Sequence, residues 1–416
     1  MSLKITVHRG TQQIGGSCIE IAHSNGERLI LDAGRPLDAP RDGRNLLPET
    51  LEKKAPATVM FSHPHMDHWG LIDELPLHWP LWTGSKSAEL MRLTTELFGG
   101  KIGRDIDTWH SRSRAFAIGG FTVTPYLTDH SAFDAYMLLI EGAGRRVLYT
   151  GDFRTHGRKA VLVDRMMAAP PPGIDVLLME GTNLGSDKPV ITERELEDKF
   201  VALARETPGH VFVQWSAQNI DRTVTLYRAA KRSGRKLVVD LYAADVLERV
   251  AAGSRVPRPS PDFELLKVMI TQGGKRLYAR QSRADFATRM ATGGSGTSRA
   301  RIAKEPAIIM LRDSMIRDFE KGGLGFRSDD AYAFSNWSGY LDLKDPNTGW
   351  AKAEAAGANT VKLHTSGHAS ASALSSFARA MAPTTLIPVH GVKWDDPGIA
   401  LPPVQRLTDG QPWLVP

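Results

Sequence analysis

Short apolar stretches that end near a polar residue recur along the first half of the chain. Residues 28–34 and 146–152 each run from an apolar segment into a glycine turn, and residues 121–126 alternate between apolar and polar positions before His130. Short runs bounded by turn residues are typical of β-strands. The pattern therefore predicts three strands, with Asp32, His130 and Asp152 at or near their ends.

A second group of elements is predicted after a proline-rich segment at 170–173. An apolar run at 174–179 indicates a buried strand that ends at Glu180, and residues 209–240 give a strand, a polar turn, a helix and a further strand. This order predicts a βαβ unit and hence a small parallel sheet. Further strands are expected within 308–315 and 332–340. At 416 residues, the chain is long enough for two domains, each with its own core.

The most informative segment is 62–68, Ser-His-Pro-His-Met-Asp-His, with three imidazoles and one carboxylate in six consecutive positions. Neutral imidazole and carboxylate are ligands of Zn²⁺. The spacing lets His63 and His65 bind one ion, while Asp67 and His68 turn toward a second ion about 3.5–4 Å away. A solvated polar loop is the alternative. A lone His130 or Asp152 would more often be a turn residue, but this run strengthens both as ligands.

Taken in order, these residues resemble the first four motifs of the metallo-β-lactamase-fold hydrolases. The resemblance implies an α/β fold, namely the αββα sandwich of that superfamily. It implies one metal at His63, His65 and His130, a second at Asp67 and His68, and Asp152 as a bridge. Asp32 would orient the ligands from behind, as metal sites generally require.

Two histidine clusters near the end of the chain extend the resemblance to the β-CASP branch. They are residues 363–368, Leu-His-Thr-Ser-Gly-His, and residues 386–391, Leu-Ile-Pro-Val-His-Gly. With Glu180 as motif A, they resemble motifs B (His368) and C (His390). The branch processes nucleic acids and includes RNase J, and a histidine at motif C goes with its RNA-acting members. His390 is therefore expected to complete the second metal site, with RNA as the substrate.

The same resemblance implies how the domains are arranged. Residues 1–172 are expected to form the first part of the metallo-β-lactamase domain, and residues 173–359 the inserted β-CASP domain. Residues 360–416 would return to complete the first domain.

Physical chemistry supports a phosphodiester substrate for such a site. Two cations that flank an in-line displacement stabilise the attacking and leaving oxygens and supply hydroxide near neutral pH. His368 is the candidate general acid for the leaving ribose oxygen, and Glu180 would hold its ring. Asp67 and Asp32 complete the predicted catalytic set. A solvated carboxylate at a strand end is the alternative for Glu180.

The polar turn that opens the helix of the second domain predicts an anion site, because helix starts bind anionic oxygens. The resemblance to RNase J implies a pocket for a 5′-phosphate there. The residues expected to line it are Ser216, Asn219, Arg222, His364, Ser366 and Gly367. Gln218 departs from the family pattern. An ordinary N-cap is the alternative for the turn, and a packed structural histidine is the alternative for His364.

Composition fits a polyanion partner without naming it. The formal net charge is +6 and the pI is about 9.3, which is modest for a nucleic-acid-binding protein. Basic residues flank the Gly- and Ser-rich segment 291–297, which could be a mobile loop over a nucleic-acid channel or part of a solvated face. Trp337 and Tyr340 could stack on bases or pack in a core or an interface.

The remaining features concern the setting. Cys18 is the only cysteine, which excludes an intrachain disulfide. The sequence shows no signal peptide and no apolar run of 18 residues. We therefore expect a cytoplasmic enzyme that does not bind membranes. The sequence predicts two divalent metal ions, with Zn²⁺ preferred and Mn²⁺ as the alternative, and a single-stranded RNA partner. Whether that RNA must have a 5′-monophosphate stays open. The sequence does not decide whether the protein forms a homodimer. The rival functions are a DNA exonuclease of the same fold, an inactive nucleic-acid-binding paralogue and a small-molecule hydrolase.

Overall fold

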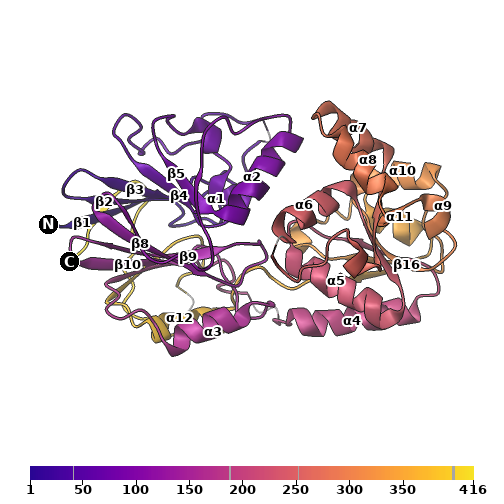
Figure 1. Ribbon diagram of the computed structural model, residues 1–416. Coiled ribbons are helices and arrows are strands. Elements are labelled where there is room, and N and C mark those ends of the chain that lie inside the picture. Colours follow the sequence, from indigo (N-terminus) through magenta and orange to yellow (C-terminus); the bar gives the residue numbers. More distant parts are fainter. Residues whose placement is uncertain (41, 187–188, 252, 396–398) are drawn as a thin grey trace. The chain divides into compact units, whose positions relative to one another are not determined.

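The computed structural model describes residues 1–40, 42–186, 189–251, 253–395 and 399–416, and Figure 1 shows the ribbon. The chain forms two compact units. Unit 1 consists of Met1–Arg92, Lys101–Pro189 and Gly367–Pro416, and unit 2 of Leu93–Gly100 and Val190–Ser366. Unit 2 is thus mainly one long insertion into the chain of unit 1.

Unit 1 contains two sheets. The first has seven strands in the order β20 (Pro412–Leu414), β1 (Leu3–Arg9), β2 (Cys18–His23), β3 (Arg28–Leu31), β4 (Thr58–Phe61), β5 (Leu81–Gly84) and β6 (Asp107–Trp109). The second has six strands in the order β19 (Thr385–Pro388), β11 (Val176–Met179), β10 (Arg145–Tyr149), β9 (Tyr136–Gly142), β8 (Phe121–Leu127) and β7 (Phe116–Ile118). The strands β3 to β6 and the strands β10, β11 and β19 are parallel.

Helices cover the outer face of each sheet of unit 1, as Figure 1 shows. They are α1 (Met66–Trp69), the 3₁₀ turn η1 (Ile72–Glu74) and α2 (Ser85–Leu97) beside the first sheet, and α3 (Ala160–Ala168) and α12 (Ala371–Met381) beside the second. Among the described residues, one apolar core lies between the two sheets. A second core lies between the first sheet and its helices, and a third between the second sheet and its helices. This layering confirms the predicted αββα sandwich.

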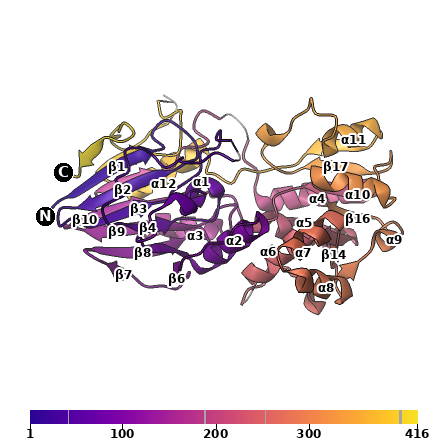
Figure 2. The ribbon, with the colours of Figure 1, turned by 90° about the horizontal axis from the view of Figure 1, so that it is seen from above.

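Unit 2 is built on one sheet of seven strands, whose neighbours all pair in parallel. Their order is β15 (Gly296–Thr297), β14 (Leu266–Met269), β13 (Lys236–Val239), β16 (Ala307–Met310), β12 (Val211–Gln214), β17 (Ala331–Phe334) and β18 (Asn359–Lys362). Figure 2 shows β14, β16 and β17 following one another across the unit. The inner strands are almost continuously apolar because both faces of a parallel sheet are covered.

The helices of unit 2 connect these strands. They are α4 (Glu193–Glu206), α5 (Ile220–Ser233), α6 (Leu241–Ala251), α7 (Gln272–Arg280), α8 (Ala284–Thr292), α9 (Arg299–Ile302), α10 (Ile316–Lys321) and α11 (Gly349–Ala355). Three 3₁₀ turns add to them: η2 (Pro261–Phe263), η3 (Asp313–Met315) and η4 (Ser338–Tyr340). Helix α5 joins β12 to β13, which confirms the predicted βαβ unit, although β16 lies between these two strands.

The two units divide later in the chain than the boundaries predicted at 172/173 and 359/360. Strand β11 pairs with β10 and β19 and so completes a sheet of unit 1 rather than starting the insertion. Strand β18 pairs with β17 and so still belongs to unit 2. Backbone hydrogen bonding therefore moves the division to Pro189/Val190 and Ser366/Gly367.

Two local predictions also need correction. The segment 291–297, for which a mobile loop was one of two alternatives, continues α8 to Thr292 and then forms β15, which pairs with β14. The strands expected within 308–315 and 332–340 end at Met310 and Phe334, and 3₁₀ turns follow them. Among the described residues, no helix combines the length and apolar character needed to cross a membrane.

Candidate metal centre

The predicted ligands lie on loops that follow strands of unit 1. Asp32 comes directly after β3, and the segment that holds His63 and His65 follows β4. In the second sheet, Glu180 comes directly after β11, while Asp152 and His390 lie in the turns after β10 and β19. Because parallel strands end at the same edge of a sheet, these side chains from distant parts of the chain gather in one place.

One cluster is formed by His63, His65 and His130, whose ligand atoms all lie within 4.8 Å of one another. The Nδ1 of His130 donates to the carbonyl oxygen of Gly367 at 2.6 Å, so its Nε2 keeps a lone pair. That Nε2 faces the Nδ1 of His65 at 3.1 Å. The Ser62 hydroxyl donates to Asp32, so the Nδ1 of His63, 3.0 Å from it, is the donor of that pair.

Burial favours the neutral form of these three rings. It lowers the pKa of His63 and His130 well below the ordinary value, and the neighbouring imidazoles add to the effect. It also lowers the pKa of His65, although the carboxylates of Asp67 and Asp152 oppose this. Neutral imidazole is the form that binds a metal ion.

A second cluster joins Asp67, His68, Asp152 and His390. The Nε2 of His68 lies 3.1 Å from the Oδ2 of Asp152, and the Nε2 of His390 lies 3.8 Å from the Oδ2 of Asp67. Asp152 also reaches the first cluster, since its Oδ2 is 3.7 Å from the Nε2 of His63. The geometry therefore allows Asp152 to contact ions in both clusters.

Several polar atoms at the centre make no hydrogen bond within the described part of the chain. They are the Nε2 atoms of His63 and His390 and the Oδ1 of Asp152, and all three are buried. An unsatisfied buried polar atom costs about 1–3 kcal/mol, so such a group of atoms calls for a ligand. Imidazole and carboxylate suit Zn²⁺ or Mn²⁺, and the residues present thus fit divalent cations.

Asp32 is fully buried behind the centre and accepts four hydrogen bonds. The donors are the backbone N–H and hydroxyl of Ser62 at 2.7 and 2.8 Å, the hydroxyl of Tyr149 at 2.6 Å and the Nδ1 of His68 at 2.7 Å. Burial opposes a charge on His68, but Asp152 and Asp32 raise its pKa well above the ordinary value. A proton and a cation would thus compete for the Nε2 of His68.

Three supporting residues were not predicted from the sequence. Ser17 lies with its Oγ 2.9 Å from the Nδ1 of His390, and Ser62 and Tyr149 both bond Asp32. Two of them carry a signal in the sequence that could have been used: Ser62 directly precedes His63, and Tyr149 ends a strand shortly before Asp152. The sequence around Ser17 gives no such signal.

Gly34 is required by the close approach of two loops. A Cβ at this position would lie 1.7 Å from the carbonyl oxygen of Asp67. The same loops are joined by backbone hydrogen bonds from Ala33 to His68 and from Arg35 to Met66, at 2.8 and 3.0 Å. The absent side chain thus lets the turn after β3 fix the ligand-bearing helix α1.

A third cluster contains Asp152, Glu180 and His368. The Nδ1 of His368 lies 3.1 and 3.2 Å from the two carboxylate oxygens of Glu180 and 3.8 Å from Asp152. Glu180 is fully buried and also accepts from the backbone N–H of Phe153. Burial opposes a charge on His368, but Glu180 and Asp152 raise its pKa to about 9. The protonated ring is therefore favoured.

Two residues predicted to bind phosphate have structural roles in unit 2. The guanidinium of Arg222 is fully buried and donates to the carbonyl oxygen of Ser335 at 2.8 Å and to Glu193 at 3.2 Å. The side chain of Asn219 accepts from the backbone N–H of Arg222 at 3.0 Å and caps α5. The phosphate role of Arg222 is contradicted, and Asn219 matches the N-cap alternative.

The other members of the predicted phosphate pocket remain a prediction. Ser216 is exposed, the Nδ1 of His364 lies 3.2 Å from the carbonyl oxygen of Ser335, and the carbonyl of Gly367 accepts from His130. Ser216, His364 and Ser366 belong to unit 2, and Gly367 belongs to unit 1.

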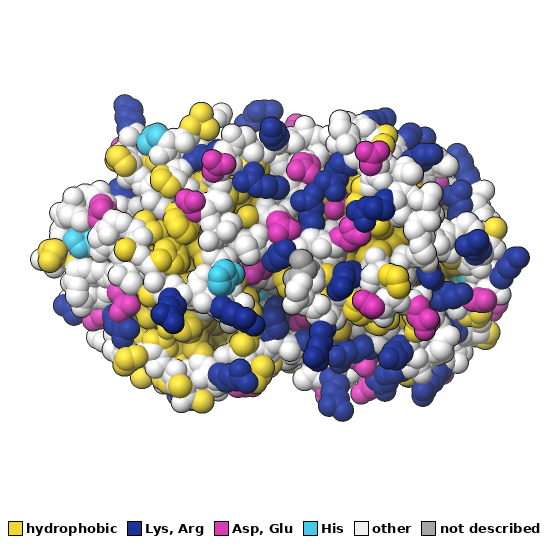
Figure 3. Space-filling model, viewed as in Figure 1, with side chains coloured by type: hydrophobic (Ala, Val, Ile, Leu, Met, Phe, Trp, Pro, Cys, Tyr) yellow, Lys and Arg dark blue, Asp and Glu magenta, His cyan; other side chains and the backbone are white. Residues whose placement is uncertain are grey.

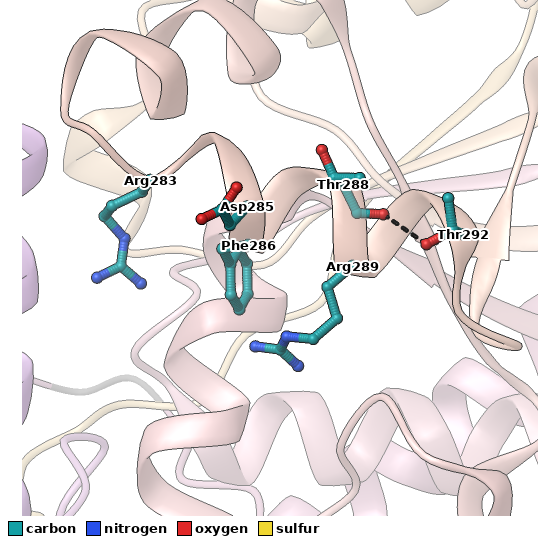
Figure 4. A pocket seen from close by; sticks show the side chains of 6 residues that line it. All are labelled: Arg283, Asp285, Phe286, Thr288, Arg289 and Thr292. Carbon is teal, nitrogen blue, oxygen red and sulfur yellow. Dashed lines mark hydrogen bonds between the residues drawn. The ribbon is translucent and has the colours of Figure 1, made fainter.

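Part of the basic segment of unit 2 is neutralised by ion pairs. Figure 4 shows a pocket on α8 in which Arg283 and Arg289 flank Phe286, with their guanidinium carbons 5.6 and 5.0 Å from the ring centre. Arg283 pairs with Asp245 at 2.5 Å and Arg289 with Glu248 at 2.7 Å. In Figure 3, Lys and Arg lie scattered among acidic side chains. This distribution favours the solvated face over a nucleic-acid channel.

Two family models match the chain. The metallo-beta-lactamase superfamily matches residues 12–191, and the Zn-dependent metallo-hydrolase RNA specificity domain matches residues 358–393. The first range includes every predicted ligand except His390, and the second includes His368 and His390.

Curated relatives are similar over much of the chain. An RNase J-like protein of Methanocaldococcus jannaschii is 28% identical over 56% of this chain, and Ribonuclease J of Thermus thermophilus is 25% identical over 84% of it. The chain spans 56% and 61% of the lengths of these two proteins. Ribonuclease J of Pyrococcus abyssi is 22% identical over 94% of this chain and 90% of its own.

A solved structure shares the fold over the full length. It is a protein of unknown function from Enterococcus faecalis V583, 20% identical, with a TM-score of 0.79 and complete coverage of both chains. At this level of identity, the likeness concerns the fold alone.

Proposed function

Since the chain belongs to the β-CASP, RNase J-like family of metallo-β-lactamase-fold proteins, we propose that it is a metal-dependent ribonuclease. The observation that carries this proposal is the place of Asp152, which belongs to two of the three clusters and lies 3.7 Å from His63 of the remaining one. Two clusters would supply ligand atoms for cations, and in the third Glu180 and Asp152 raise the pKa of His368, which favours its role as proton donor.

The residues divide into two cation sites. His63, His65 and His130 would hold one divalent cation, and a second would lie among Asp67, His68 and His390, with Asp152 touching both. Zn²⁺ is the preferred ion for these ligands, and Mn²⁺ is the alternative. When bound, such cations activate water and offset negative charge on a phosphodiester.

The surrounding side chains position the ligands and move the proton. Asp32 fixes the orientation of His68, and Ser17 lies within hydrogen-bonding distance of His390. His368 would give its proton to the leaving ribose oxygen, and Glu180 keeps the ring oriented and charged. The ring would then take up a proton from solvent water, and Glu180 would favour this step by stabilising the positive charge.

RNA is proposed as the substrate because the RNA specificity model spans His368 and His390. We further propose single-stranded RNA, cut from a 5′-monophosphorylated end in the 5′-to-3′ direction, at internal sites, or both. Ser366 and Gly367, directly before His368, are the residues proposed to contact that end.

The test uses a 5′-monophosphorylated RNA that is labelled at each end in turn, with a DNA of the same sequence beside it. We expect RNA to be cut with Zn²⁺ or Mn²⁺ and not with chelator, and the two labels separate release of single nucleotides from internal cuts. Cleavage of DNA alone would make the chain a DNA nuclease. No cleavage of either polymer, with no ion bound, would support an inactive paralogue.

A further inference from the structure

The carboxyl edge of the sheet in unit 2 has the geometry of a ligand site. From β12 the chain crosses through α5 to β13 on one side, and from β16 it crosses through α10 to β17 on the other side of β12. The loops after β12 and β16 therefore leave in opposite directions. In parallel sheets, such a change of direction opens a crevice at the carboxyl ends of the strands, and ligands bind there.

A pocket of about 440 Å³ lies at this point, entirely within unit 2. Residues from the loops after β12, β16 and β17 line it, among them Gln214, Ser216, Arg312, Asp313, Asn336 and Tyr340. Its volume is within the range of about 300–1,000 Å³ that small-ligand pockets occupy.

Two aromatic side chains are exposed at this pocket or beside it. Trp337 is 55% exposed and Tyr340 is 69% exposed, and their ring centres lie 5.2 Å apart at nearly a right angle. Gly339 makes room for the indole, because a Cβ there would lie 2.3 Å from two of its ring carbons. The core-packing alternative for these aromatics is thus wrong. Exposed rings on a shaped loop suit a stacking partner such as a nucleobase.

The charges of the pocket disfavour a phosphate, and with it the phosphate role predicted for Ser216, which lines the pocket. Arg312 is engaged by Asp240 at 2.6 Å, and its guanidinium carbon lies 5.2 Å from the ring centre of Tyr242. Asp313 is exposed and brings a carboxylate that would repel phosphate. Its oxygens already accept from the backbone N–H of Gly349 at 2.7 Å and from Gln214 at 3.4 Å, and a carboxylate has lone pairs for further donors.

We propose that this pocket binds one ribonucleoside unit of single-stranded RNA, with the base stacked on the indole of Trp337, its edge toward Tyr340, and the ribose 2′-hydroxyl donating to Asp313. The 2′-hydroxyl is the only free ribose donor of a nucleotide inside an RNA chain, so this contact distinguishes RNA from DNA. The choice of RNA rests on the proposed ribonuclease function, which this pocket would make more specific.

The binding test uses free adenosine and 2′-deoxyadenosine, which have no phosphodiester to be cut, with the full-length metal-loaded protein. Dissociation constants from ligand-detected NMR are expected to be lower for adenosine. Trp337→Ala should weaken adenosine binding at least about fivefold, the lower limit for the loss of one stacked base. Asp313→Asn should weaken adenosine binding about tenfold and leave that of 2′-deoxyadenosine unchanged.

Phe98→Ala is the matched control, because Phe98 is 84% exposed and lies elsewhere in unit 2. It should leave both dissociation constants unchanged. Absence of adenosine binding, or equal effects of Trp337→Ala and Phe98→Ala, would overturn the proposal. Equal binding of the two nucleosides would overturn the role of Asp313. If RNA is cut normally while adenosine fails to bind, only this inference falls. If adenosine binds while RNA is never cut, only the proposed ribonuclease function falls.

Discussion

The carboxyl edges of the parallel strands in the two units are built in opposite ways. In unit 1, Asp32 is fully buried and accepts four hydrogen bonds, and the ligand atoms of each candidate cluster lie within 4.8 Å of one another. In unit 2, Asp313 and Trp337 stand at the surface. Ligands of a cation must be held in one geometry, whereas a flexible strand can be bound by exposed rings. Burial of the polar residues thus separates the two kinds of site.

The largest effect on activity is expected at His368, whose contact with the buried Glu180 favours the protonated ring. His368→Ala should lower kcat on RNA by about 10²–10⁴, the usual contribution of a general acid, while the metal content stays the same. Because His78 is exposed, His78→Ala is the control and should leave kcat unchanged. A fall in bound metal equal to the fall in kcat would show that His368 is a ligand instead.

The next effect tests whether the buried polar residues of unit 2 serve the fold. Arg222→Met leaves Glu193 charged and buried, and we expect the free energy of unfolding to fall by about 3–5 kcal/mol in urea titrations. The double variant Arg222→Met/Glu193→Leu should recover most of this loss. An unchanged stability together with a lost preference for 5′-monophosphorylated RNA would restore the phosphate role of Arg222.

A smaller effect, on metal affinity, is expected at Asp32, which hydrogen-bonds the candidate ligand His68. Asp32→Asn should weaken metal binding about 10–100-fold, as is usual for residues that orient ligands. Titration of the metal-free protein with Zn²⁺ against a competing chelator measures this. Asp73→Asn, at an exposed position of unit 1, is the control. Equal affinities of the two variants would mean that the hydrogen bond from His68 to Asp32 does not orient the ligand.

The residues that gather at the candidate metal centre could be predicted because they form a continuous run or follow strands, two features that a sequence displays directly. The supporting contacts could not be predicted, because their partners lie far apart in the sequence, as Ser17 and His390 do. The sheet to which 174–179 belongs was also out of reach, because a buried apolar strand has the same pattern in either sheet. Arg222 was misjudged for a similar reason. A charge at a helix start gives no sign that Glu193 will bury it.

The central claim is that Asp152 is shared by two cations, and metal content per chain tests it most directly. Elemental analysis by inductively coupled plasma mass spectrometry, after dialysis against limiting Zn²⁺, should find two ions in the unaltered protein and at most one in Asp152→Asn. Two tightly bound ions in Asp152→Asn, or none in the unaltered protein, would contradict the account.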